Sequence, residues 1–323
     1  MRAAYYEQNG PAKDVLHVGE VETPKPGSGE VRIRLRTSGV NPSDVKTRAG
    51  TARKIAFPRV IPHSDGAGEI DMVGEGVAPS RVGERVWTWN GQWKRAFGTA
   101  AEYIMLPEHQ AVRLPDAISF EAGACLGIPA LTAWHAIDIA HTESGKTLLI
   151  AGGAGAVAHY AIQFAKARGA TVIATVSSPA KAKIARDAGA DHTIDYKTEN
   201  VGERVMALSN GGVDTVIEMD LTANAVLLPA VLRPRGTLVV YGTGPQVQFP
   251  GSFCLVNNIT VKFLLVYELT ADERARAIGD ITRMLEANAL QHNVAKTFPL
   301  SDIVAAHEAV ESGKVAGNVV MRL

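Results

Sequence analysis

The sequence contains little of several residue types that would point to other classes of protein. It has only two cysteines, Cys125 and Cys254, in 323 residues, too few for a disulfide framework or a cysteine-rich metal site. Both lie in apolar stretches, so we expect them in the core of a protein kept in the reducing cytoplasm. Thirty-three basic and thirty-three acidic residues leave no net charge. This balance gives no electrostatic reason to expect nucleic acid or an anionic membrane as the main partner.

Long apolar runs are also absent. No stretch is long enough to span a bilayer, and the start, MRAAYYEQNGP, lacks the apolar core of a signal peptide. The composition, 46% hydrophobic and 20% charged, is typical of a globular protein. A chain of this length suggests two domains.

The pattern of the chain changes near residue 126. The preceding part is rich in turns and short strands, such as EVRIRLR at residues 30–36, whose alternation predicts a half-buried strand. Strands and helices then alternate up to residue 266. Apolar runs predict the six strands of a doubly wound parallel sheet, at residues 148–150, 171–176, 192–195, 213–218, 237–241 and 259–265.

The tail of the chain predicts two helices and a strand. Thr270 and Glu273 form a capping box before a helix at residues 271–288, and a second helix is expected at 301–312. A final apolar strand at 318–323 needs a pairing partner. We expect it to return to the first domain.

The segment TLLIAGGAGAVA at residues 147–158 is the clearest motif. It fits G-x-G-x-x-A, the small-residue form of a dinucleotide-binding turn between a strand and a helix. Gly153 would allow the tight turn, Gly155 would let a pyrophosphate approach the backbone, and Ala158 would let the helix lie close to the sheet. An ordinary tight turn remains the alternative. The strand–helix–strand–helix–strand series that follows favours nucleotide binding. The predicted pyrophosphate contacts are Gly153, Ala154, Gly155, Ala156 and Val157.

The second predicted strand lacks the acidic residue that binds the ribose 2′-hydroxyl of NAD. It ends at Ser177 and Ser178, with Lys181 following and Tyr196 lying just after the third strand. A 2′-phosphate needs hydroxyl and cationic partners, so NADPH is the expected cofactor. Lys181 could equally be a solvated helix lysine, and the missing acid is the stronger signal.

The order of these segments resembles the medium-chain dehydrogenase/reductase superfamily, and most closely its zinc-free quinone oxidoreductase (zeta-crystallin-type) branch. The resemblance covers essentially the whole chain. Its marks are GVNPSDVKTRAG (39–50), IPHSDGAGEI (61–70), GTAAEYIMLP (98–107), GIPALTAWHAI (127–137), GGAGAVA (152–158), GADHTIDY (189–196), DTVIEM (214–219) and GKVAGNVVM (313–321).

The resemblance implies an α/β protein of two domains. A GroES-like β-rich catalytic domain would comprise residues 1–125 and 267–323, and a Rossmann NADPH-binding domain with a six-stranded parallel sheet would comprise residues 126–266. The implied activity is NADPH-dependent, metal-free hydride transfer to a quinone or related conjugated carbonyl. The family also suggests a homodimer joined through the nucleotide domain.

The positions that hold catalytic zinc in a related branch differ here. Asn41 and Ser64 stand where that branch has a cysteine and a histidine, Cys125 is out of step with the third ligand, and the four-cysteine structural lobe is absent. His63 is adjacent to Ser64 but out of register. The resemblance therefore implies that no metal takes part.

Site residues follow from the matching segments. Asn41 would line the cleft and orient the substrate carbonyl, and Thr132 would contact the nicotinamide; for Asn41 an Asn-Pro turn role is equally open. Asp44 would accept a hydrogen bond from Arg48 and hold the loop. The remaining cofactor contacts would be Ser177, Lys181 and Tyr196 at the adenosine phosphate, Gly242 and Thr243 at the sheet edge, and Phe263 and Leu265 beside the nicotinamide.

The chain departs from the branch where substrate would sit. Ala52 replaces a frequent tyrosine, Asn318 replaces a lysine, and we expect at least one of Trp87, Trp89 and Trp93 to line the pocket. Two other functions therefore stay open. One is a reductase of 2-alkenals, enones or enoyl thioesters, and the other is a non-catalytic NADPH-binding protein of structural or RNA-binding type.

Overall fold

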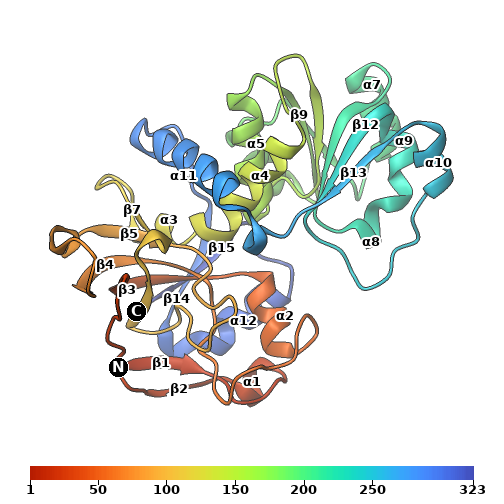
Figure 1. The fold of residues 1–323 in the computed structure, drawn as a ribbon. Helices are drawn as coiled ribbons and strands as arrows, with labels where there is room; N and C mark the ends of the chain where they lie inside the picture. The colour runs from red at the N-terminus through yellow and green to blue at the C-terminus, as the bar shows by residue number, and fades with distance from the viewer. The chain divides into compact units, whose positions relative to one another are not determined.

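The computed structural model describes residues 1–323, which divide into two units (Figure 1). The first unit comprises Met1–Pro129 and Ile278–Leu323, and the second comprises Ala130–Ala277. Residues 267–277 thus group with the second unit. None of the helices has both the length and the apolar character that a membrane crossing requires.

The first unit is built on a seven-stranded sheet. The order is β14-β15-β3-β4-β5-β7, and β6 pairs with β3 as well. Its strands are β3 (Glu30–Val40), β4 (Asp65–Val73), β5 (Arg85–Thr88), β6 (Tyr103–Pro107), β7 (Ala111–Arg113), β14 (Val294–Pro299) and β15 (Asn318–Arg322). The same unit holds a separate two-stranded sheet of β1 (Arg2–Tyr5) and β2 (His17–Glu20). Its helices are α1 (Ala12–Val15), α2 (Pro42–Ala49), α3 (Phe120–Gly123) and α12 (Ile303–Glu311).

Strand β3 confirms the predicted alternation and extends it. Val31, Ile33 and Leu35 are buried in one core cluster, whereas Arg34 and Arg36 are exposed. The strand runs on to Val40 because β4 and β15 both pair with its second half. The predicted return of the C-terminal strand is confirmed, since β15 pairs antiparallel with β3 and parallel with β14.

The second unit contains a six-stranded parallel sheet in the order β10-β9-β8-β11-β12-β13. This is a doubly wound order, so the predicted six-stranded doubly wound sheet is confirmed. The strands are β8 (Thr147–Ile150), β9 (Thr171–Val176), β10 (His192–Asp195), β11 (Val213–Glu218), β12 (Leu232–Val240) and β13 (Thr260–Phe263). The helices are α4 (Leu131–Ile139), α5 (Ala156–Ala167), α6 (Pro179–Asp187), α7 (Val201–Ser209), α8 (Leu221–Asn224), α9 (Leu228–Val231) and α10 (Gly251–Val256). Figure 1 shows α4 and α5 on one side of this sheet and α7 and α9 on the other.

Helix starts follow the predicted caps. The Ser178 hydroxyl accepts from the Lys181 N–H at 3.3 Å and so caps α6. At α11 (Ala271–Glu286), Thr270 and Glu273 exchange the two hydrogen bonds of a capping box.

The expectation that both cysteines are buried is half wrong. Cys125 is fully buried, but Cys254 is only partly buried on α10. The reason is that α10 packs against the core mainly through Phe253, while Leu255 and Val256 are exposed. Both cysteines are free thiols.

Candidate active site and cofactor site

The glycine turn lies between β8 and α5, at the carboxyl edge of the parallel sheet. Its left-handed residue is Gly152, with φ at +67°, rather than Gly153. A side chain at Gly153 would instead collide with Ala174, since its Cβ would lie 2.7 Å from the Cβ of that residue. The turn is tied to β9 because the N–H groups of Gly152 and Gly153 both donate to Thr175, at 3.0 and 2.9 Å.

Unpaired donors face outward from this turn. Gly155 is the N-cap of α5 and offers no side-chain cap, and no hydrogen bond engages the N–H groups of Ala156 and Val157. These donors, together with the positive end of the twelve-residue helix, form an anion site. These backbone donors could therefore hydrogen-bond to the oxygen atoms of a pyrophosphate at this turn.

The end of β9 brings together the residues assigned to a 2′-phosphate. Ser177 follows the strand directly, Lys181 is in the first turn of α6, and the Tyr196 N–H donates to the Val176 carbonyl at 3.1 Å. Tyr196 is 53% exposed, and no carboxylate pairs with Lys181. The local set is hydroxyl and cationic, so it fits a phosphate better than a ribose hydroxyl.

The other assigned cofactor residues lie where parallel strands end. Gly242 and Thr243 follow β12, and the Gly242 carbonyl accepts from the Leu221 N–H at 3.1 Å. Phe263 ends β13 and is 65% exposed, and Leu265 is also exposed. Helix α4 places Thr132 in its first turn, where the side chain is buried and its hydroxyl makes no hydrogen bond.

In the first unit, Asn41 joins two buried carboxylates. Its backbone N–H donates to Asp44 Oδ2 and its side-chain Nδ2 donates to Asp65 Oδ2, both at 2.8 Å. Asn41 is the N-cap of α2 and is itself buried. The bond to Asp65 uses one of the two N–H groups of the amide.

Burial raises the pKa values of both carboxyl groups. The pKa of Asp44 rises to about 7, with the hydrogen bonds from Asn41 acting in the opposite direction. Burial raises the pKa of Asp65 well above its usual range, and the nearby Asp44 raises it further. Asp65 Oδ1 is buried without a partner. Gly127 is required beside it, because a Cβ there would lie 2.3 Å from this oxygen.

The predicted Asp44–Arg48 hydrogen bond is wrong. The Arg48 guanidinium turns to the other side of α2 and donates to the Gly10 carbonyl and to Glu311 Oε1, at 2.6 and 2.7 Å. Helix α12 packs against α2 and supplies this glutamate. Asp44 is held by the Asn41 backbone instead.

The residues at the zinc-branch positions are engaged in other contacts. Ser64 is buried, and its carbonyl accepts from the Gly91 N–H. His63 is fully buried. Its Nδ1 forms a hydrogen bond with the Ser38 hydroxyl, and its Nε2 forms a hydrogen bond with His307 Nε2, both at 2.9 Å. No group of three or more histidine, cysteine, aspartate or glutamate side chains in the chain is arranged to hold a metal ion.

The three tryptophans separate into core and surface. Trp87 is fully buried and Trp89 nearly so, whereas Trp93 is half-buried beneath Arg53, whose Cζ lies 4.2 Å from the ring centroid. Of the three, only Trp93 is partly exposed, and Lys94 also lies over its ring.

Sequence reasoning missed Asp65 and Glu218. Glu218 ends β11, is buried, and accepts from the Asp220 N–H and the Asn224 amide. Each strand also contains other acidic residues, Glu69 and Asp71 in β4 and Asp214 in β11, so the sequence alone does not single these two out.

Two family models match the chain. Residues 27–116 match the family described as alcohol dehydrogenase GroES-like domain, and residues 156–283 match the family described as zinc-binding dehydrogenase. The expected GroES-like first domain is thereby confirmed.

Whole-length relatives are quinone oxidoreductases and a reductase. The chain is 30% identical to the quinone oxidoreductase of Pseudomonas aeruginosa and to a 2-haloacrylate reductase of a Burkholderia species, each over 99% of this chain and 98% of the relative. The structure matches Pseudomonas syringae quinone oxidoreductase with a TM-score of 0.90 and 27% identity, covering 100% and 99% of the two chains. Escherichia coli quinone oxidoreductase complexed with NADPH matches with a TM-score of 0.88 and 25% identity, over all of both chains.

Proposed function

This chain belongs to the quinone oxidoreductase branch of the medium-chain dehydrogenase/reductase superfamily, and we propose that it reduces quinones or related conjugated carbonyls with NADPH. The observation that carries the proposal is the glycine turn, with its unpaired N–H groups at Ala156 and Val157 and the acid-free end of β9. NADPH is the cofactor named in a similar solved enzyme.

The NADPH-binding residues are assigned by their places on the sheet. The turn from Gly153 to Val157 holds the pyrophosphate, and Ser177, Lys181 and Tyr196 hold the 2′-phosphate. Gly242 and Thr243 border the site at the end of β12. Thr132, Phe263 and Leu265 contact the nicotinamide.

Asn41 is the catalytic residue of this proposal. When bound, NADPH supplies a hydride from the C4 carbon of its nicotinamide. The second N–H of the Asn41 amide donates to the acceptor oxygen on which negative charge develops, and solvent supplies the proton that completes the reduction. Asp65 fixes the amide so that its nitrogen, and not its oxygen, faces the acceptor, because Asp65 Oδ2 accepts its other N–H. The buried setting strengthens the hydrogen bond to the acceptor.

A second function is favoured by one relative. The 2-haloacrylate reductase reduces a conjugated double bond by name, so an enone, alkenal or enoyl-thioester reductase is the alternative on the same site. The hydride would then reach the β-carbon while Asn41 still donates to the carbonyl oxygen.

An acceptor panel separates these functions. We expect NADPH oxidation, followed at its absorbance band, with 1,4-benzoquinone and 1,4-naphthoquinone, and slower oxidation with trans-2-hexenal and crotonyl thioester. Faster turnover of the alkenal or thioester would favour the alternative. Tight NADPH binding with no turnover of any acceptor would identify a non-catalytic binding protein.

A homodimer through the second unit completes the proposal. Strand β13 is an edge of the parallel sheet, and the neighbouring Leu255 and Val256 are exposed. Pairing two such edges would cover both the apolar side chains and the unpaired strand. Light scattering of the purified protein checks the mass. The two free thiols support a reducing, cytoplasmic location.

A further inference from the structure

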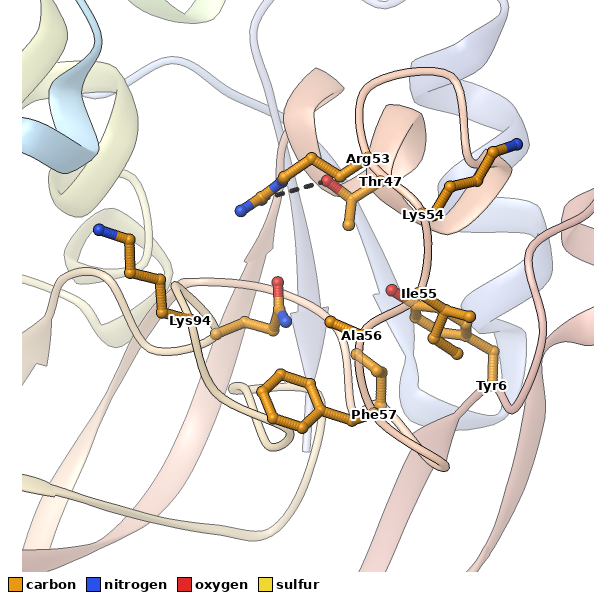
Figure 2. A pocket seen from close by; sticks show the side chains of 10 residues that line it. Tyr6, Thr47, Arg53, Lys54, Ile55, Ala56, Phe57 and Lys94 are labelled. Atoms are coloured by element: carbon orange, nitrogen blue, oxygen red, sulfur yellow. Dashed lines mark hydrogen bonds between the residues drawn. The ribbon is translucent and has the colours of Figure 1, made fainter.

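A pocket in the first unit lies outside the residues assigned above. Its cavity is about 300 Å³, and it is bordered by the last turn of α2 and by the loops near residues 53–57 and 92–94. Its lining residues are Tyr6, Thr47, Arg53, Lys54, Ile55, Ala56, Phe57, Val60, Gln92 and Lys94. Figure 2 shows these side chains. Three of them are cations and none is an acid.

Arg53 is the cation best placed to meet a ligand. One of its nitrogens donates to Thr47 Oγ1 at 3.3 Å, as Figure 2 shows, and its guanidinium lies over the Trp93 ring. These contacts hold the group in position, and no carboxylate forms an ion pair with it, although its charge lowers the pKa of the more distant Asp44. Lys94 lies over the same ring, with Nζ at 5.4 Å from the centroid. In Figure 2 the Lys54 ammonium points away from the pocket.

Tyr6 gives the pocket a second polar group. The residue is 2% exposed, and its hydroxyl makes no hydrogen bond in the structure. Figure 2 shows this hydroxyl turned toward the pocket beside Ile55. Burial raises the pKa of the Tyr6 phenol to about 12, so the group is an O–H donor. Because this O–H has no hydrogen-bond partner within the protein, it can donate to an acceptor atom of a ligand in the pocket.

Apart from Gln92, the remaining lining residues are apolar. Ile55 and Phe57 pack against the core of the first unit, and Ala56 and Val60 complete the floor. A small flat or conjugated body fits against such walls.

We propose that this pocket binds the carboxylate of a small conjugated or aromatic acid, with Arg53 and the Tyr6 hydroxyl donating to it, and so favours acceptors that bear a carboxylate. The acid is favoured over a phosphate for two reasons. The pocket adjoins the C-terminal end of α2, whose partial negative charge opposes a dianion. It also lacks the helix N-terminus that commonly binds phosphates.

Binding is tested first, without turnover. Calorimetry compares 2-naphthylacetate with 2-naphthylacetamide, which has the same body and no charge. We expect the wild-type protein to bind the acid about tenfold more tightly, as charge-assisted hydrogen bonds imply. Equal affinities would overturn the proposal. If inorganic phosphate displaces 2-naphthylacetate as effectively as benzoate does, the pocket binds anions in general, and the proposed preference for carboxylates is wrong.

Variants identify the residues responsible. Arg53→Gln should reduce the acid-to-amide ratio to about twofold or less. Arg34→Gln is the matched control, since Arg34 is an exposed arginine without an ion pair on β3, and it should leave the ratio unchanged. Tyr6→Phe should lower the ratio without lowering the melting temperature, because the lost hydroxyl has no partner to leave behind. If Arg53→Gln keeps the wild-type preference for the acid over the amide, Arg53 does not bind the carboxylate and the proposal is wrong.

Acceptor choice is tested last and rests on the proposed function. We expect 3-(1,4-naphthoquinon-2-yl)propanoate to be reduced with a kcat/KM about tenfold above that of its methyl ester. If neither quinone oxidises NADPH while naphthylacetate binds, the proposed activity fails and the pocket stands. If ester and acid turn over equally, the activity stands and selection by this pocket fails.

Discussion

The polar groups around Asn41 and those at the glycine turn before α5 differ in whether they are already hydrogen-bonded within the protein. Around Asn41 in the first unit, the polar groups are buried and mostly satisfied by one another, through Asp44 and Asp65. At the turn before α5 in the second unit, the N–H groups of Ala156 and Val157 are unpaired.

The difference follows from what each site must meet. A nucleotide brings its own charge, so the turn needs only open donors and a positive helix end. A neutral acceptor develops charge only as it is reduced, so its donor must be oriented in advance. The first site is therefore a preformed network that holds the Asn41 amide in place. The second is a set of open donors that a ligand completes.

Removing the Asn41 amide should have the largest effect. Asn41→Ala is expected to lower kcat by about 100-fold, the usual effect of losing one donor to a developing oxyanion, while the NADPH dissociation constant changes little. Steady-state kinetics with 1,4-naphthoquinone and NADPH titration by fluorescence measure the two quantities.

Asn41 is also the N-cap of α2, so stability must be separated from chemistry. Asn41→Ser keeps a good N-cap residue but removes the amide, and should be as slow as Asn41→Ala while melting at a higher temperature. Equal losses of turnover and NADPH affinity in either variant would disprove the catalytic role.

Lys181 tests the open side of the comparison, with a smaller effect. Lys181→Gln should reduce the preference for NADPH over NADH by about tenfold, because an unpaired ammonium contributes one charge-assisted bond to the 2′-phosphate. The ratio of the two kcat/KM values measures this preference.

Lys183→Gln is the control on the same helix. Its ammonium is already paired with Asp187 at 2.6 Å, so the preference should not change. If both variants change the NADPH-to-NADH preference by a similar factor, Lys181 contributes only as a surface charge and does not bind the 2′-phosphate directly.

The open site was the more predictable from sequence. Backbone donors at a strand–helix turn need only small residues at fixed spacing, and the spacing from Gly153 to Ala158 reveals them. Even so, the glycine with positive φ in this turn is Gly152, and not Gly153 as expected. The motif locates the turn but does not specify which of its glycines adopts the left-handed conformation. The six strands of the parallel sheet and the C-terminal strand of the first unit were predicted from apolar runs in the same way.

The buried network was not predictable in this way. Asn41 and Asp65 meet through the pairing of β3 with β4, where Gly39 faces Asp65, a contact that no local pattern encodes. Arg48 illustrates the same limit. Its spacing from Asp44 suggested a bond along α2, but a residue from α12, far away in sequence, supplies the partner.

Titration of Asp44 gives the smallest and most specific test of that network. The folded protein keeps a proton on Asp44 up to about pH 7, whereas the unfolded chain releases it near pH 4. The folded state thus binds more protons in this window. The free energy of unfolding therefore falls as pH rises through it, by up to about 1.4 kcal/mol per pH unit. Asp44→Asn removes this contribution and should gain stability relative to the wild type as pH rises.

His63 and His307 act in the opposite direction. Burial lowers their pKa values, that of His63 to about 3, so the unfolded chain binds protons that the folded chain does not. The wild-type curve thus mixes both effects, but the difference between Asp44→Asn and wild type reports on Asp44 together with Asp65, whose pKa Asp44 raises.

Urea unfolding between about pH 5 and 7, followed by tryptophan fluorescence, measures this difference. The fluorescence signal reports mainly on the first unit, which contains Asp44, because Trp87, Trp89 and Trp93 all lie in that unit. Asp14→Asn, which removes a carboxyl group at an exposed position of α1, is the control variant. A difference between Asp44→Asn and wild type that does not change with pH would mean that Asp44 is ionised in the folded protein. The network around Asn41 would then hold a full negative charge beside the donor that the acceptor needs.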